Sequence, residues 1–397
     1  MGPGRLAAAR CGVRRVLGGV RRVRVGAGRG RRRARALGPH VRRPHGAARS
    51  GRRGGRVSAA GAARPAFAVA VPARDGLPDV LDAVRSALDQ TLPPAEVVVA
   101  DDGSADGTGD AVRAAFGDRV RVLAGRWGSA AAARNAAWRA SRAPWVAFLD
   151  ADDLWFPDKL ETAARALAAA PRAEWFFSDG AFRTLEGRLE PSWFGLYADV
   201  DDGYVGAPLA QLMEVNFILT SSVVARRDAL EALGGFREDM THAEDADLWI
   251  RLARRAPAAA SARALVRYQH RPGGLTRQVE ARLAGTASLF RRLSADGSLD
   301  PALRRVARRR VALAEHKLAV AALREGRRAD ARRHLRGAWL FPERAVAWAV
   351  LCAAAWAPAG VLARGRRSRT LTRGVAAPLG RGRRVRLAAD AAAGRPS

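Results

Sequence analysis

Three aspartates stand close together in the stretch VAFLDADDLW, residues 146–155. Asp150 and Asp152 are one residue apart and directly follow an apolar run, where like charges repel each other unless a cation lies between them. Two carboxylates at this spacing in a loop can converge on one hard divalent cation, and phosphate oxygens can complete its shell. A Mg²⁺ or Mn²⁺ site formed by Asp150 and Asp152 is therefore one interpretation of this stretch. The alternative for so short a pattern is a solvated acidic loop.

Two further acidic pairs occupy positions where charge could do chemistry. Asp101 and Asp102 end the run AEVVVADD, and Gly103 permits a turn directly afterwards. Glu244 and Asp245, in HAEDADLWIRLARR, lie at the predicted N-terminus of a helix, where the helix dipole favours negative charge. Taken one at a time, a turn with a helix cap and ordinary helix-terminal charge account for these residues.

The elements that must position these residues alternate between short β-branched runs and helical patterns, which predicts an α/β fold with an open, mostly parallel sheet. We predict strands at residues 67–76, 95–104, 119–125, 145–150 and 173–182, and helices at 77–88, 109–116, 129–141 and about 157–170. Ligands of such sheets lie beyond the carboxyl ends of the strands. We therefore expect residues 101–102 and 150–153 to border one crevice.

The second half of the chain is predicted to become increasingly helical. Residues 184–215 look loop-rich, and residues 216–236 indicate a strand and a helix that stops at Gly234 and Gly235. From about residue 276 the pattern is helical throughout, with two helices parted at Gly326. Residues 345–363 carry no charge and match a bilayer in length, although alanine dominance makes insertion weak. We expect either peripheral membrane attachment or an Ala-rich helix packed on the domain.

These patterns divide the chain into four parts. They are a disordered Arg-, Gly- and Ala-rich tail at 1–63, an α/β domain at 64–275, a helical extension at 276–363 and a basic disordered tail at 364–397. Two interpretations of residues 1–63 stay open, a basic arm or a start assigned too far upstream.

The charge of the chain is uneven. Of the net +31, residues 1–60 contribute 18 arginines and no acid, which leaves +13 for the rest. Only two lysines are present, as a GC-rich genome would produce, so the basicity argues weakly for nucleic acid and we predict no specific nucleic-acid partner. The two cysteines lie at opposite ends, and the N-terminus has no apolar signal-peptide core. We expect a cytoplasmic location, at the inner face of the plasma membrane if the apolar segment attaches.

The D-x-D stretch becomes a more specific signal of function because three other characteristic stretches accompany it. VAVPARDG, ADDGSADGT, GSAAAARNAAWRAS and WVAFLDADDLWFPDKL follow one another along one βα series. In this arrangement the chain resembles the inverting glycosyltransferases of family 2, with the GT-A nucleotide-sugar fold, over about residues 66–275. The resemblance implies transfer of a sugar from a nucleotide-diphosphate sugar, typically a UDP-sugar, to a hydroxyl of a glycan, a lipid-linked intermediate or a small acceptor. Such a reaction belongs to the synthesis of cell-surface polysaccharide or glycolipid.

The resemblance also implies where the donor binds. The implied nucleotide-sugar contacts are Pro72, Ala73, Arg74, Asp101, Asp102, Arg134, Asn135 and Asp150. Asp102 is the main candidate for the base, since a carboxylate suits the uracil N3 proton. The family's usual Thr-Tyr-Asn after the proline reads Ala73-Arg74-Asp75 here, so Arg74 could stack on the base and the base preference is less defined. Arg134 could offset diphosphate charge, or could be a solvent-exposed helix arginine.

On the acceptor side the resemblance makes Asp245 the general base, which takes the proton of the attacking hydroxyl, and Glu244 a residue that orients the acceptor. His270, in YQHRPGGLT, could complete the metal shell with Asp150 and Asp152 or touch a phosphate, although a lone histidine is more often structural. Since Asp150 and Asp152 match the family's D-x-D, the resemblance makes Asp152 the main metal ligand and Asp150 a contact of the ribose or the metal. Asp153 is expected to support its loop.

Three alternatives share parts of this pattern. A nicotinamide-dependent α/β oxidoreductase needs G-x-G-x-x-G after the first strand, where this chain has VPARDG. A non-catalytic basic protein that binds nucleic acid or a membrane surface would lose its activity with residues 1–60. A retaining transferase or a nucleotidyltransferase could use a similar sheet, and the anomeric form of the product would distinguish the retaining enzyme.

Overall fold

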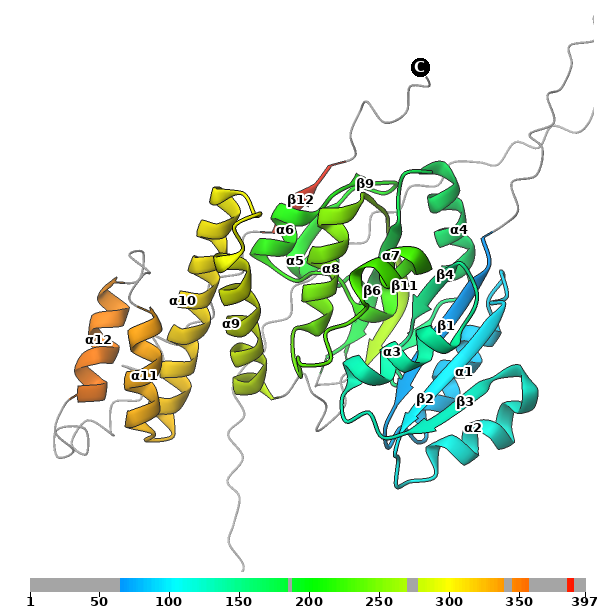
Figure 1. Cartoon of the computed structure of the whole chain (residues 1–397), viewed down its shortest axis with the longest axis horizontal. Coiled ribbons are helices and arrows are strands. Elements are labelled where there is room, and N and C mark those ends of the chain that lie inside the picture. The colour runs from blue at the N-terminus through cyan, green and yellow to red at the C-terminus, as the bar shows by residue number, and fades with distance from the viewer. Residues whose placement is uncertain (1–64, 185–187, 270–277, 339–344, 357–383, 389–397) are drawn as a thin grey trace, which may run out of the picture. The chain divides into compact units, whose positions relative to one another are not determined.

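The computed structural model describes residues 65–184, 188–269, 278–338, 345–356 and 384–388 (Figure 1). Every described residue belongs to the compact unit Gly61–Ser397. The tail predicted at 1–63 and the candidate ligand His270 lie outside the described residues.

The first half of the sheet is parallel, as predicted. It contains β1 (Phe67–Ala73), β2 (Glu96–Asp102), β3 (Arg121–Gly125) and β4 (Trp145–Phe148). These strands lie side by side in the order β3-β2-β1-β4, so their carboxyl ends meet at one edge. That edge holds both acidic clusters expected there.

The second half of the sheet mixes directions. β10 (Val224–Arg226) runs antiparallel to β4 and to β6 (Trp175–Arg183), and β11 (Ala258–Gln269) lies parallel to β6. The short strands β5 (Leu154–Trp155), β7 (Leu189–Glu190) and β9 (Val205–Gly206) add antiparallel edges. The predicted α/β fold with a mostly parallel open sheet is confirmed. Strand β11 was not predicted, because its alanine-rich sequence lacks the β-branched residues typical of strands.

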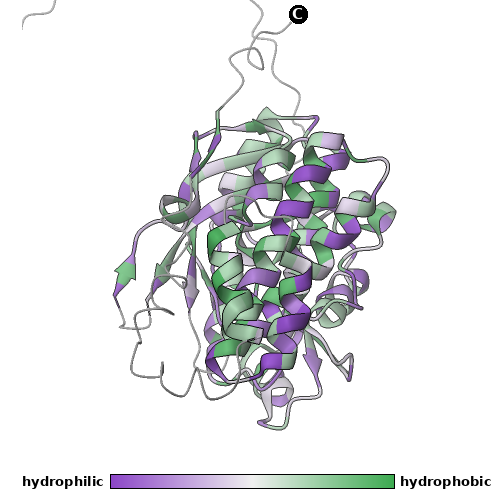
Figure 2. Cartoon of the chain, turned by 90° about the vertical axis from the view of Figure 1, so that its left-hand side faces the viewer, coloured by the Kyte–Doolittle hydropathy of each residue, from purple (hydrophilic) through white to green (hydrophobic). Residues whose placement is uncertain are grey.

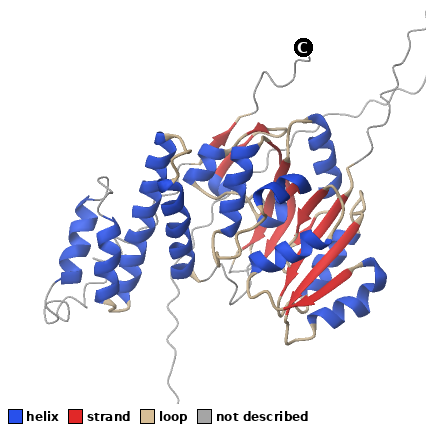
Figure 3. Cartoon of the chain, in the orientation of Figure 1, coloured by secondary structure: helices blue, strands red, loops and turns tan. Residues whose placement is uncertain are grey.

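Helices cover both faces of the sheet (Figure 3). One core includes residues of α1 (Asp79–Leu88), α2 (Thr108–Phe116) and α4 (Lys159–Ala169). The other includes residues of α3 (Ala130–Ala140), α6 (Leu209–Glu214), α7 (Arg227–Leu233) and α8 (Glu244–Arg255). Strand β1 shows why two cores form, because its alternate residues Val69 and Ala70 belong to opposite ones.

The C-terminal region is helical, as predicted. It contains α9 (Val279–Ala295), α10 (Pro301–Arg324), α11 (Arg328–Ala338) and α12 (Ala345–Trp356). Gly326, with a φ of 77°, separates α10 from α11, as expected. Leu289 and Phe290 of α9 are buried in the same core as α3 and α8, so the predicted boundary at 275/276 does not separate two cores. None of the described helices is long and apolar enough to cross a membrane.

Two segments carry more structure than predicted. The region 184–215 includes, besides β7, β9 and α6, the helix α5 (Phe194–Tyr197) and the strand β8 (Ala198–Val200). Within the tail expected to be disordered at 364–397, β12 (Val385–Leu387) pairs in parallel with β8. The reason is local, since Arg386 forms ion pairs with Asp199 and Asp201 while Leu387 is buried. The strand was not predicted, because the basic composition of residues 364–397 is typical of a disordered tail.

Candidate functional site

The D-x-D loop is folded around one serine. The backbone N–H of Asp150 donates to Ser221 Oγ at 3.0 Å, and Ser221 Oγ donates to a carboxylate oxygen of Asp153 at 2.6 Å. Ser221 belongs to the 3₁₀ turn that precedes β10, the strand next to β4 in the sheet. This leaves the side chains of Asp150 and Asp152 partly exposed at the rim of the loop.

Asp153 faces into the protein instead. It is 1% exposed, and it also accepts a hydrogen bond from the backbone N–H of Gln269 at 3.1 Å. Burial, followed by the charges of Asp152 and Asp150, raises the pKa of its carboxyl well above the ordinary value. The expected role of Asp153 in supporting the loop is confirmed.

Arg134 connects this loop to helix α8. Its Nε and Nη2 donate to Asp150 Oδ1 at 3.1 and 2.9 Å, and its Nη1 donates to Glu244 Oε1 at 2.9 Å. The side chain is 8% exposed and lies over the ring of Phe236, 5.4 Å from its centroid. Burial opposes the positive charge, but the two carboxylates outweigh it and raise the pKa of the guanidinium above its ordinary value. The alternative of a solvent-exposed helix arginine is therefore wrong.

Asp245 is partly exposed in the first turn of α8. Asn216 Nδ2 donates to its Oδ2 at 2.9 Å, and the backbone N–H of Ala246 donates to its Oδ1 at 2.7 Å. Desolvation, followed by the charge of Glu244, raises the pKa of Asp245 to about 6, while these hydrogen bonds and Arg134 act in the opposite direction. A carboxylate with a pKa near the working pH and an open side can accept a proton from a bound hydroxyl.

The turn that leads into α8 is constrained. Ala243, directly before Glu244, has a φ of 64°, which a residue with a Cβ adopts only at a cost in free energy. Helix α9 packs against this turn, because a Cβ added at Gly285 would lie 2.7 Å from the carbonyl oxygen of His242. The first helix of the C-terminal extension thus supports the backbone that carries Glu244 and Asp245.

A pocket opens where β1, β2 and β3 end. It has a volume of ≈ 340 Å³ and is lined by Arg74, Asp102, Gly103, Arg126, Trp127 and Gly128. Asp102 is buried and accepts hydrogen bonds from the backbone N–H groups of Trp127 and Gly128, while Arg74 Nη1 lies 3.9 Å from its Oδ2. The pocket is therefore concave and lined by charged side chains of both signs.

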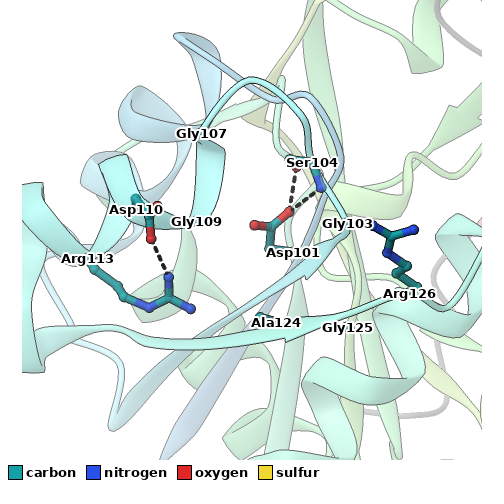
Figure 4. Close-up of a pocket in the computed structure, with 10 residues that line it drawn as sticks. All are labelled: Asp101, Gly103, Ser104, Gly107, Gly109, Asp110, Arg113, Ala124, Gly125 and Arg126. Carbon is teal, nitrogen blue, oxygen red and sulfur yellow. Dashed lines mark hydrogen bonds and ion pairs between the residues drawn. The ribbon is translucent and has the colours of Figure 1, made fainter.

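A second pocket of ≈ 450 Å³ lies on the other side of the β2 end (Figure 4). Asp101 lines it, and its carboxylate accepts a hydrogen bond from the backbone N–H of Ser104 at 3.1 Å, which forms the Asx-type turn weighed above. Figure 4 also shows Arg113 paired with Asp110, at 2.8 Å, on helix α2. Asp101 therefore shapes the loop between the two pockets.

Three other residues that were predicted to contact the nucleotide sugar are buried within the fold. Pro72 and Ala73 are buried at the end of β1, where Ala73 pairs with Asp101 and sets Arg74 at the rim. Asn135 is completely buried, and its amide makes four hydrogen bonds, two with the backbone of Phe236 and one each with the side chains of Glu238 and Trp138. Our expectation that Asn135 faces the nucleotide is therefore wrong, because Phe236 and Glu238 before α8 and Trp138 on α3 take up all its hydrogen-bonding capacity.

Sequence reasoning missed the residues that hold the candidates in place. They are Asn216, which contacts Asp245, Ser221 and Gln269, which hold the D-x-D loop, and the loop 126–128 behind Asp102. The only sequence signal was the placement of polar residues within apolar runs, as in NFILTSSVV.

The parallel half-sheet with acidic residues at its carboxyl ends, followed by an acidic helix start, defines a GT-A nucleotide-sugar fold. The crystal structure of TarS 1–349 from S. aureus in complex with UDP-GlcNAc shares this fold, with a TM-score of 0.54 and 17% sequence identity over 73% of this chain and 87% of that one. Residues 68–187 match the family model described as Glycosyl transferase family 2. Over these residues the chain is similar to the family 2 glycosyltransferases, as predicted.

Two curated relatives are similar over shorter stretches. The putative teichuronic acid biosynthesis glycosyltransferase TuaG of Bacillus subtilis is 43% identical over 83 residues, 20% of this chain and 33% of that protein. A UDP-Glc:alpha-D-GlcNAc-diphosphoundecaprenol beta-1,3-glucosyltransferase, WfaP of Escherichia coli, is 36% identical over 78 residues, 19% of this chain and 31% of its own. The match thus spans about a third of the length of these relatives.

Proposed function

We propose that this chain transfers a sugar, with inversion, from a nucleotide-diphosphate sugar to a hydroxyl group. The observation that carries the proposal is the connection between two motifs, since Arg134 holds both Asp150 of the D-x-D loop and Glu244, the neighbour of Asp245. Donor-side and acceptor-side carboxylates thus belong to one site.

The reaction uses Asp245 as the general base. Its carboxylate takes the proton of the acceptor hydroxyl while the hydroxyl oxygen forms a bond to C1 of the sugar, on the face opposite the nucleotide. The bond between C1 and the diphosphate oxygen breaks, its electron pair goes to the diphosphate, and the nucleoside diphosphate leaves. A raised pKa, to about 6, suits this role because the carboxylate is both ionised and basic near neutral pH.

The donor would occupy the pocket at the ends of β1 to β3. Asp102 and Arg74 would contact the base and ribose, and Asp101 would fix the loop beside them. We take a UDP-sugar as the first donor to test, in line with the UDP-glucose in the name of the Escherichia coli relative. We take synthesis of a cell-surface polysaccharide as the matching process, because the Bacillus subtilis relative is named for teichuronic acid biosynthesis and the Escherichia coli relative for a diphosphoundecaprenol-linked acceptor.

The residues present fit a divalent cation. Asp150 and Asp152 are both partly exposed carboxylates, and the hydrogen bonds from Arg134 use Oδ1 of Asp150, not Oδ2. Asp150 and Asp152 would supply carboxylate ligands, and oxygens of the donor phosphates would take further positions of the shell. A bound Mg²⁺ or Mn²⁺ would stabilise the charge of the departing diphosphate.

A lipid-linked acceptor would place the enzyme at the inner face of the plasma membrane. Helix α12 supports this, because it carries no charge and its exposed side chains include Val346, Val350 and Trp356, 80%, 36% and 49% exposed. Figure 2 shows the C-terminal helices from this side, with hydrophobic positions of the ribbon in green. Arg332 of α11 lies over the Trp356 ring, 5.6 Å from its centroid, and Arg333 beside it is 70% exposed. An apolar face beside exposed arginines matches an anionic bilayer surface.

The donor can be identified without knowing the acceptor. Full-length protein is screened against UDP-, GDP- and dTDP-sugars with Mn²⁺, with thermal shift and donor hydrolysis as readouts. We expect one nucleotide class to stabilise the fold and to be hydrolysed, and the released sugar to show an inverted anomer by NMR. A retained anomer would exclude inversion. If no donor stabilises the fold and none is hydrolysed, the proposed function is refuted.

Membrane contact is tested separately by co-sedimentation with phosphatidylglycerol vesicles and with phosphatidylcholine vesicles. We expect binding to the anionic vesicles alone and its loss in Val346→Glu, while Ala329→Glu, on the exposed side of α11, serves as the control. Equal binding of Val346→Glu and the wild type would remove α12 from the proposal.

A further inference from the structure

Arg134, which links the two motifs of the proposed site, has an environment that is unusual for an arginine on a helix. An arginine at the surface of a helix forms weak, solvent-screened ion pairs, as Arg139 does on the same helix α3, where it is 51% exposed and pairs with Glu238 at 2.9 Å. Arg134, five residues earlier, is 8% exposed and makes three hydrogen bonds to two carboxylates. Two arginines of one helix therefore have opposite environments.

The two partners of Arg134 come from distant parts of the chain. Asp150 follows β4, and Glu244 opens α8, 110 residues away from Arg134. The planar guanidinium holds Asp150 through two nitrogens and Glu244 through the third, an arrangement that a lysine ammonium cannot reproduce. The contact with the Phe236 ring fixes the plane of the guanidinium as well.

The same guanidinium acts on Asp245. Two charged groups act on the Asp245 carboxyl in opposite directions. Glu244, on the same helix, raises its pKa, and Arg134, on α3, lowers it. Asn216 Nδ2 and the Ala246 N–H donate hydrogen bonds to the same carboxylate. Arg134 is thus a positive charge that favours ionised Asp245.

We propose that Arg134 is a positioning residue for both halves of the site, which fixes Asp150 and Glu244 in one arrangement and keeps Asp245 available as a base. The expected change in kcat rests on the proposed function, whereas the expected change in the ionisation of Asp245 does not. A loss of Arg134 would leave two carboxylates with no common cation, and the proton on Asp245 would be held more tightly.

The test compares Arg134→Met and Arg134→Lys with the control Arg139→Met. In ¹³C-aspartate-labelled protein, the Asp245 carboxyl signal is assigned by its absence in Asp245→Asn and is titrated in each variant. We expect the midpoint to rise by about 1 pH unit in Arg134→Met, to rise less in Arg134→Lys and to stay unchanged in Arg139→Met. An unchanged midpoint in folded Arg134→Met would overturn the proposal.

The kinetic arm uses donor hydrolysis. We expect kcat to fall about 100-fold in both Arg134 variants, because Lys keeps the charge but not the geometry, with the acidic limb of the pH profile shifted upward in Arg134→Met. If Arg134→Met does not fold, the double variant Arg134→Met/Glu244→Gln, which removes the unpaired charge, is titrated in its place. If Asp245 then has the same midpoint as in Glu244→Gln alone, Arg134 does not act on Asp245. If the midpoint of Asp245 shifts in Arg134→Met but the wild type hydrolyses no donor, only the proposed function is refuted. If both Arg134 variants keep the wild-type kcat, only the positioning role is refuted.

Discussion

The donor half and the acceptor half of this site are built in different ways. On the donor side, Asp101 binds the loop three residues ahead, and Asp102 binds the loop that follows β3, the next strand along the chain. On the acceptor side, Glu244 meets an arginine 110 residues away, and Asp245 meets Asn216, 29 residues back. At the ends of β1 to β3 the donor half is therefore held by neighbouring loops, while Glu244 of the acceptor half and the D-x-D loop, which Ser221 and Gln269 hold, depend on segments 71 to 116 residues away.

The two halves also differ in their electrostatics. Arg74 is 62% exposed beside Asp102, and solvent screens such an ion pair. Arg134 is buried between Asp150 and Glu244, where water cannot replace a lost partner. Substitutions should therefore have larger effects around α8 than around the ends of β1 and β2.

The largest effect is expected for Asp245→Asn. The amide keeps the size of the side chain but cannot take the proton of the acceptor hydroxyl, so we expect kcat to fall by about 10³-fold or more. Donor binding, measured by calorimetry, should stay within about twofold because the donor pocket lies at the ends of other elements. A variant with wild-type turnover would remove Asp245 from the reaction.

The pH dependence of the wild type sharpens this test. With its pKa raised to about 6, Asp245 binds a proton more tightly in the folded than in the unfolded chain, so its contribution to stability falls as the pH rises from about 4 to 6. Activity follows the opposite direction, because the base form appears only as the pH passes about 6. We expect Asp245→Asn to lack this part of the pH dependence of Tm, and an identical dependence in both proteins would contradict the assigned pKa.

The next effect concerns the rim of the D-x-D loop. Asp152→Ala removes the main expected metal ligand, and we predict a loss of donor turnover of about 100-fold together with weaker Mn²⁺-dependent donor binding. The fold should persist, because Asp152 is partly exposed and Asp153 still holds the loop to Ser221. Asp82→Ala, an exposed carboxylate on α1, is the control and should leave both quantities unchanged. Full Mn²⁺-dependent binding in Asp152→Ala would exclude the metal site.

This contrast explains how much the sequence could predict. The strand ends with Asp102 and Asp150 follow apolar runs, so their position at one sheet edge was predictable from local patterns. The partner of Glu244 was not, because no periodicity in α3 distinguishes Arg134 from Arg139, and only the packing of α3 between the sheet and α8 buries one of them. The prediction for Asn135 was wrong for a similar reason, because its partners Phe236 and Glu238 lie about 100 residues further along the chain.

Helix α9 offers a test of how far the acceptor half extends. Alanine favours a helix over glycine by about 1 kcal/mol, but a Cβ at Gly285 would meet the carbonyl of His242 at 2.7 Å and push the turn that carries Glu244. We expect Gly285→Ala to lower kcat about 10-fold without changing donor affinity. Gly297→Ala, where a Cβ meets nothing within 4 Å, is the matched control. Equal turnover in both variants would confine the acceptor half to α3 and α8.

The smallest effect is expected at the donor rim. Arg74→Ala removes an exposed side chain whose ion pair with Asp102, at 3.9 Å, is long and screened, so Tm should not change. If Arg74 stacks on the base, the donor KM should rise by up to about 10-fold while kcat stays the same, since the stacking is lost in the ground state and the transition state alike. A lower kcat at constant KM would instead place Arg74 near the departing diphosphate. The donor half would then share the sensitivity that we assign to the acceptor half, and the difference between the two halves would lie only in how each is assembled.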